Sequence, residues 1–270
     1  MTVYWPLALL TFKEGIRNRA LYGISLIAFL FLGANVLISG SAMREIGKVA
    51  VDMALSTISF TGLLLVLFIG INLMAKDLDK RTIYMVLSRP ISRPQYIVGK
   101  FFGMALLIVV TIAVLSVFGM LSIIIEKWAY PDYFPRFFWG PIFLAVLFAA
   151  LSLILLSAVS FFFASFSSSS FLTLILTIMA YIIGQSLSDV KALVEAPQTA
   201  GITVSPVTHI IVQAAYYLFP NLSLFDLKIQ AAHGLAVSPS YVGWTALYGL
   251  AYTCLMLFFA ALIFRKKEFP

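Results

Sequence analysis

Side chains that could carry out chemistry are scarce in this sequence of 270 residues. The two histidines, His209 and His233, lie 24 positions apart, and the single cysteine, Cys254, lies within an apolar run. A metal site needs three or four ligands close together, and neither an HExxH nor a CxxC spacing supplies them. We therefore expect no catalytic residue and no metal ligand, and we interpret each histidine as an interfacial polar residue.

Nucleotide and nucleic-acid binding are also poorly supported by the sequence. No GxxxxGK[ST] loop occurs, so we expect no ATP or other cofactor on this chain. If ATP drives the protein, the ATPase must be another chain. The net charge of +7 is better explained by basic loops on one side of a membrane than by a nucleic-acid partner.

The most charged stretch is KDLDKRTIYMVLSRPISRPQYIVGK, residues 76–100, which holds six of the 18 Lys and Arg residues. A short helix in its first half must end near Pro90. Ser92 can then cap a second helix, with Pro94 in its first turn, that continues past Lys100. Two helical pieces joined by a basic turn fit docking into a groove of a partner protein. Contact with lipid headgroups is the alternative role for the basic residues, and we expect both.

The surrounding sequence indicates that lipid is the solvent. The chain is 62% hydrophobic and 11% charged, whereas soluble domains are about 25% charged. A helix needs about 20 apolar residues to cross a bilayer. Long apolar stretches that meet this length are Leu21–Gly40, Leu55–Ala75, Phe101–Ile125, Gly140–Leu187 and Trp244–Phe264. The stretch 140–187 is long enough for two spans and must fold back at Ser165–Ser170, where hydroxyls compete for backbone hydrogen bonds. The sequence therefore predicts an all-α integral membrane protein with six transmembrane helices, embedded in a lipid bilayer.

Lys and Arg residues set the predicted orientation. With the N-terminus inside, twelve of them lie in inner segments and six in outer segments, so both termini should be cytoplasmic. We expect a single transmembrane domain, 1–270, with a cytoplasmic loop at 76–100 and an outer loop at 189–242.

Residues 1–20 are predicted to form an interfacial helix. Trp5, Leu9, Phe12 and Ile16 form one apolar stripe on a helix, as expected for a helix lying on the membrane surface. A ragged continuation of the first span is the alternative.

The outer loop 189–242 should also contain helices. Ser205–Pro220 has a good N-cap and an early proline but is too short to span, which suggests a re-entrant or interfacial helix. A second short helix is expected over Ser223–His233, ending at Gly234.

The predicted spans contain no Asp, Glu, Lys, Arg or His, which argues against an ion-coupled transporter. Milder polar residues do occur, Asn35 among them. They either line a wet path or hydrogen-bond between packed helices, and packing is the commoner role. The candidates for a substrate path are Asn72, Ser157, Ser160, Thr173, Thr177 and Gln185.

Two motifs resemble a known family. The run RTIYMVLSRPISRPQYIVGKFFG resembles the signature of ABC-type-2 transporter permeases, especially the branch with the nitrous-oxide-reductase maturation and gliding-motility permeases. The matching positions are Arg81, Thr82, Leu87, Pro90, Ile91, Ser92, Arg93, Tyr96, Gly99 and Lys100. The run YYLFPNLSLFDL, residues 216–227, is similar to the P-N-L-x-x-[FL]-[DN] segment before the last span. The acids before R-T are often Glu in that branch; here they are Asp77 and Asp79, which conserves the charge.

The resemblance implies an export permease in a bacterial inner membrane. Its loop 76–100 would be the coupling helix, seated on a cytoplasmic ATP-binding subunit that carries the ATP and Mg²⁺. Two permease chains, expected as a homodimer, would combine with two ATPase subunits. The coupling residues would be Asp79, Arg81, Thr82, Tyr84, Met85, Arg89, Pro90, Ile91, Ser92, Arg93, Tyr96 and Lys100. Arg89 and Arg93 would pair with acidic groups of the ATPase, while Tyr84, Met85 and Ile91 would fill its groove.

Two other functions are alternatives to export. One is a membrane anchor or assembly factor that moves no substrate. The other, an intramembrane enzyme, lacks a reactive constellation. Span interiors without charge favour a lipid-like or apolar cargo but do not exclude a peptide, a polysaccharide or a sulfur species.

Overall fold

The computed structural model describes residues 4–40, 45–73, 92–134, 137–167, 169–195 and 205–266. These residues form helices and short turns and contain no strand. The long helices are α1 (Tyr4–Ile16), α2 (Arg19–Ser39), α3 (Ile46–Leu65), α6 (Arg93–Ala129), α7 (Trp139–Phe166), α8 (Ser170–Glu195), α10 (Pro206–Leu218) and α12 (Pro239–Lys266). Helix α3 continues through a π-helical turn, η1 (Val66–Gly70), to Leu73.

Six of these helices, α2, α3 with η1, α6, α7, α8 and α12, are long and apolar enough to cross a membrane. The predicted six-span, all-α architecture is therefore confirmed. The fold-back predicted at Ser165–Ser170 lies between the end of α7 and the start of α8. There the Ser165 hydroxyl donates to the Phe162 carbonyl (2.6 Å) and the Ser167 hydroxyl accepts from the Ser169 N–H (3.2 Å). These local bonds replace the regular helical ladder, as expected for a serine run.

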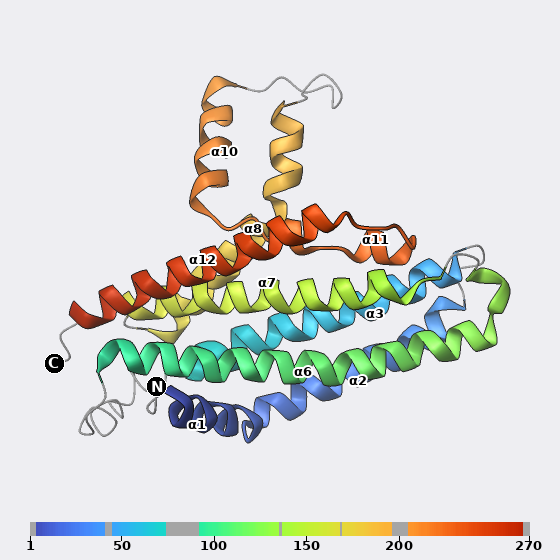
Figure 1. Ribbon diagram of the computed structural model, residues 1–270, viewed down its shortest axis with the longest axis horizontal. Helices are drawn as coiled ribbons and strands as arrows, with labels where there is room; N and C mark the ends of the chain where they lie inside the picture. Colours follow the sequence, from blue (N-terminus) through green and yellow to red (C-terminus); the bar gives the residue numbers. More distant parts are fainter. Residues whose placement is uncertain are drawn as a thin grey trace.

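Five spanning helices, α2, α3, α6, α7 and α12, run side by side along the long axis of the molecule (Figure 1). Helices α3 and α7 are the most buried of the spanning helices. In the most apolar stretch of each helix, 67% of the residues of α3 and 56% of those of α7 are buried, against 22% for α2 and for α12. We call the end that holds α1, the start of α6 and the end of α12 the basic end, because Arg17, Arg93, Arg265 and Lys266 lie there. The opposite end, where α2 ends and α3 begins, is the far end.

Helix α1 is separate from the first span. The Asn18 side chain caps α2 by accepting from the Ala20 N–H (3.0 Å). The predicted stripe is exposed at Trp5 and Ile16, consistent with a lipid-facing surface. The opposite face, with Leu7, Ala8, Thr11 and Gly15, is buried. Its interfacial position remains a prediction.

Helix α10 and the C-terminal part of α8 form a hairpin that projects away from the bundle, whereas the first part of α8 lies against α7 (Figure 1). The α10 helix begins as predicted, with the Ser205 hydroxyl accepting from the Val207 N–H (3.4 Å). Helix α8 extends about two turns past the predicted end at Leu187, and Lys191 and Glu195 form an ion pair in the added turns (3.7 Å).

The helix predicted over Ser223–His233 is divided in two. A 3₁₀ turn, η3 (Ser223–Phe225), is followed by α11 (Lys228–Ala232). Asp226 separates them because its carboxylate accepts from the Lys228 N–H (3.2 Å). The chain then leaves α11 through Gly234, whose φ of 62° favours glycine.

Helix α6 is longer than the predicted span 101–125. It begins at Arg93 and ends at Ala129, so it includes Lys100 and Glu126, which are both buried. The predicted span 101–125 contains no charged residue, whereas the longer helix buries one on each side of it. The cause is that an apolar run ends at the first charged residue, whereas the helix and its packing continue.

Candidate coupling site and polar pocket

The start of α6 is the part of the predicted coupling segment that the structure describes. Ser92 is the N-cap, its N–H donates to Gln95 Oε1 (2.9 Å), and Pro94 lies in the first turn. This agrees with the predicted second helix of the segment. The other coupling residues lie outside the described part of the chain: Asp79, Arg81, Thr82, Tyr84, Met85, Arg89, Pro90 and Ile91.

Two contacts hold the start of α6 against the end of α12. The buried ring of Tyr96 stacks on Phe264, with centroids 6.0 Å apart and an interplanar angle of 15°. One turn earlier, Arg93 Nη1 donates to the carbonyl of Arg265 (3.4 Å). The first turn of α6 is therefore in direct contact with the end of α12.

A third contact joins α6 to α3. The Lys100 side chain is buried, and its ammonium donates to the carbonyl of Leu73, the last described residue of α3. The same nitrogen lies 5.4 Å from the centre of the Tyr96 ring. An ammonium that donates to a carbonyl forms a charge-assisted hydrogen bond, which is stronger than a neutral one. Lys100 thus connects Leu73 of α3 to the first turns of α6.

Small residues bring α1 close to the same part of α6. A Cβ atom at Gly103 would lie 2.5 Å from the Ala8 carbonyl oxygen, and one at Gly99 would lie 2.7 Å from a methyl of Leu7. The nearby Thr11 hydroxyl donates to the Leu7 carbonyl (2.9 Å), which leaves its methyl toward Gly103. The start of α6 is therefore in contact with α1, α3 and α12 at once.

The residues predicted for a substrate path lie in different surroundings. Ser157, Ser160, Thr173 and Thr177 are buried. Three of them donate to backbone carbonyls three or four residues earlier: Ser157 to Ile154 (2.7 Å), Thr173 to Ser169 (3.2 Å) and Thr177 to Thr173 (2.7 Å). Asn72 is exposed, and its amide donates to the Phe68 carbonyl one turn earlier. Such local bonds are typical of hydroxyls in packed helices, whereas the buried Ser160 Oγ has no hydrogen-bond partner.

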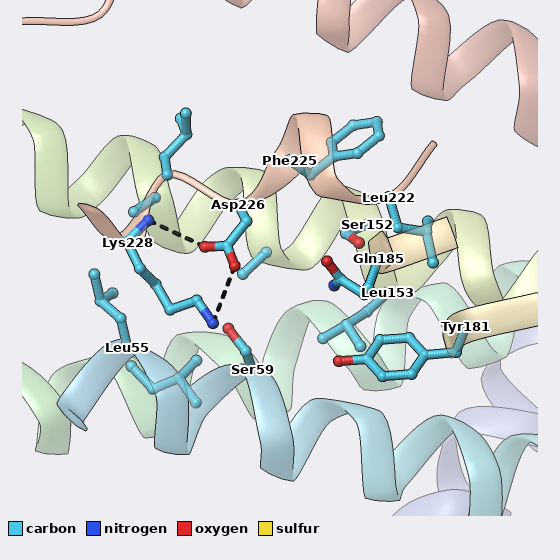
Figure 2. A pocket seen from close by; sticks show the side chains of 14 residues that line it. Leu55, Ser59, Ser152, Leu153, Tyr181, Gln185, Leu222, Phe225, Asp226 and Lys228 are labelled. Carbon is cyan, nitrogen blue, oxygen red and sulfur yellow. Dashed lines mark hydrogen bonds and ion pairs between the residues drawn. The ribbon is translucent and has the colours of Figure 1, made fainter. Parts of the chain in front are cut away.

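Only Gln185 of that set lines a polar pocket, which lies between α3, α7, α8 and the η3–α11 segment. Figure 2 shows its amide near Ser152 of α7, with Tyr181 of α8 and Ser59 of α3 on the same cavity. At the other side, Asp226 accepts from Lys228 Nζ (3.1 Å). The cavity volume is about 50 Å³, whereas ligand pockets measure about 300–1,000 Å³. In this conformation the pocket can admit the tip of a polar group but not a whole substrate.

The PNLSLFDL segment, residues 220–227, forms one wall of this pocket. The Leu222 N–H donates to the Gly184 carbonyl (3.0 Å), and a Cβ at Gly184 would lie 2.6 Å from the Pro220 oxygen. Asn221 fixes the segment to α8 and α12. Its backbone N–H donates to the Tyr248 hydroxyl (2.9 Å), and its Nδ2 donates to Ser188 Oγ (2.9 Å). Five residues that line the pocket were not predicted from the sequence: Ser59, Ser152, Tyr181, Asp226 and Lys228. Of these, Asp226 could have been found, because it occupies the final [DN] position of the motif.

The two histidines lie at different places. His209 lines a small cavity of the α8–α10 hairpin with Lys191 and Glu195. His233 lies beyond α11 on a cavity of about 460 Å³ at the far end, together with Glu45 and Asp132. Among the described residues, no group of three or more His, Cys, Asp or Glu side chains is arranged for metal binding.

This architecture is that of a polytopic helical membrane protein. At its basic end, α1, α3 and α12 all contact the start of α6. The family profile of the ABC-2 family transporter proteins matches residues 5–269, and the chain belongs to that family. A search of curated proteins gave no significant match. The protein is therefore a transmembrane subunit of the ABC-transporter type.

Proposed function

We propose that this chain is the permease of an ATP-driven exporter in a bacterial inner membrane, with both termini in the cytoplasm. Two copies would form a homodimer served by two cytoplasmic ATPase subunits, which carry the ATP and Mg²⁺. Family membership supports the transporter role. The motifs RTIYMVLSRPISRPQYIVGKFFG and YYLFPNLSLFDL favour the branch with nitrous-oxide-reductase maturation and gliding-motility permeases.

The observation that carries the coupling role is the set of contacts at the start of α6. Tyr96 and Arg93 connect it to α12, Lys100 connects it to α3, and Gly103 lies against α1. Segment 76–91, held between Leu73 and Ser92, is the natural point for an ATPase to push. A movement there would reach three neighbouring helices and switch the bundle between two discrete arrangements.

Co-purification tests the partner. Tagged chain should bring down an ATPase, and the double variant Arg89→Glu/Arg93→Glu should abolish this association together with transport-linked ATPase activity. The matched control is Lys13→Glu/Arg17→Glu, which changes the charge equally at the same end of the bundle but on α1. If the first variant keeps the complex and its activity, the docking role is wrong.

An assembly role without transport is the second candidate function. It predicts that an ATPase subunit unable to hydrolyse ATP still supports the biological process, because only the membrane platform is needed. An exporter predicts complete loss with the same ATPase. The uncharged interior of most spans favours a lipid-like cargo, so lipids are the first substrates to test for ATPase stimulation in nanodiscs.

A further inference from the structure

A cluster of buried polar side chains lies at the far end, between α2, α3 and α6. It consists of Asn35 and Ser39 on α2 and of Ser122 and Glu126 on α6. Asn35, Ser39 and Glu126 have no solvent exposure and Ser122 has 5%. Neither the coupling contacts nor the polar pocket involves these residues, so the cluster needs its own explanation.

Hydrogen bonds fix the orientation of its members. Asn35 Nδ2 donates to the Ala50 carbonyl of α3 (3.1 Å) and to Ser122 Oγ (3.2 Å). Because a carbonyl can only accept, the amide nitrogen must face Ala50, and Oδ1 points the other way. The Ser122 hydroxyl in turn donates to Glu126 Oε1 (3.2 Å).

Three oxygen atoms of the cluster remain without a partner: Asn35 Oδ1, Ser39 Oγ and Glu126 Oε2. In the described part of the chain only five buried side-chain atoms are in this condition, and three of them lie here. Ser39 faces the Glu126 carboxyl, although not at hydrogen-bond geometry. Buried polar atoms normally have partners, so a shared ligand is indicated.

The carboxylate also lacks a counter-charge among the described residues. The neighbouring Lys127 directs its ammonium over the Phe137 ring (4.5 Å). Lys48, near the start of α3, pairs with Glu45 (2.7 Å). A buried carboxylate whose charge no described residue balances is strongly unfavourable, so a cationic ligand would stabilise it.

We propose that this cluster binds one dehydrated monovalent cation of sodium size. One carboxylate with neutral amide and hydroxyl oxygens matches a single positive charge, and oxygen ligands suit hard cations. A water would satisfy the three oxygens without neutralising Glu126, and a proton would neutralise it while donating only one hydrogen bond. A bound cation does both. It would tie α2 to α6, with Asn35 extending the connection to α3, and this role does not depend on the proposed function.

Binding of ²²Na⁺ to the full-length chain in nanodiscs, with any co-purifying ATPase retained, tests the site. We expect one saturable site per chain, lost in Glu126→Gln. The matched control is Glu195→Gln, which alters an exposed carboxylate in the α8–α10 hairpin and should bind as the wild type does. Sodium should raise the thermal midpoint of wild type relative to choline at equal ionic strength, but not that of Glu126→Gln.

Ser39→Ala keeps the proposal testable if Glu126→Gln does not fold. It removes one neutral ligand and should weaken sodium binding at least about tenfold. Unchanged affinity in Ser39→Ala would overturn the ligand set. A wild-type midpoint that rises on acidification through Glu126, without saturable sodium binding, would assign a proton instead. Insensitivity to both sodium and pH would assign a buried water.

Discussion

The ring of Tyr96 on α6 lies stacked on the ring of Phe264 on α12, with the two centroids 6.0 Å apart. Both side chains are almost completely buried, although 168 positions separate them in the sequence. The contact joins the beginning of one span to the end of another at the basic end. It gives the proposed push on segment 76–91 a direct path to α12.

Removing one ring of this stack should both destabilise and uncouple the protein. Phe264→Ala should lower the free energy of unfolding by about 3–5 kcal/mol, because it leaves a cavity of aromatic size. Phe264→Leu fills more of the space and should cost less, yet lose the ring contact. Substrate-stimulated ATPase activity of the reconstituted complex is the measurement. Equal stimulation in wild type and Phe264→Leu would show that the stack does not transmit motion.

Lys100→Met should weaken the contact between α3 and α6 at the basic end. The substitution keeps the length of the side chain but leaves the Leu73 carbonyl without its buried donor, at a cost of about 1–3 kcal/mol. Thermal unfolding in nanodiscs measures the loss. The control is Lys127→Met at the far end, whose ammonium lies over an aromatic ring rather than on a carbonyl. A larger effect of the control would contradict the assigned role of Lys100.

Gly103→Ala should separate α1 from α6. The added methyl would approach the Ala8 backbone oxygen to 2.5 Å, and because a backbone atom cannot rotate away, we expect a loss of about 1–3 kcal/mol. Gly33→Ala in α2 meets no atom within 4 Å and should be neutral or slightly stabilising, since alanine favours helix. If the two variants unfold at the same temperature, α1 is not held closely against α6.

The α8–α10 hairpin should lie near a second copy of the chain. Its outer surface exposes Val207, Ile210, Ile211 and Leu218, each more than 60%, and the hairpin projects from the bundle. In a Cys254→Ser background, Ile210→Cys should form a disulfide-linked dimer in membranes on mild oxidation. Trp128→Cys, on a highly exposed residue at the far end of α6, is the control and should remain monomeric. The reverse result would place the dimer contact elsewhere.

Sequence patterns were most informative where local chemistry decides the structure. Ser92, Ser205 and the run 165–170 set helix ends through hydrogen bonds to neighbouring backbone groups, and the structure has helix ends at all three. The six spans could be predicted for the same reason. Whether a segment can cross a bilayer depends on the length of its own apolar run and not on contacts with distant segments.

Features that depend on contacts between distant segments could not be predicted. Glu126 stands one position beyond an apolar run, and only the packing of α2 and α3 against it makes it buried. Ser59 and Ser152 look like any other serines of a span until η3 and α11 fold over them. Conversely, Thr173 and Thr177 were candidates for a path because polarity alone does not show which neighbour a hydroxyl has.

The π-helical turn at Val66–Gly70 has a consequence for the register of α3. A regular α-helix advances about 100° per residue, whereas the π turn holds one extra residue in almost the same rotation. Converting it to regular α-helix at the same chain length would therefore rotate everything after it by roughly 100°. The Leu73 carbonyl would then point away from Lys100, although every side chain named at the basic end would still be present. The extra residue held in this turn, and not only residue identity, therefore sets the orientation of the helix end at Leu73.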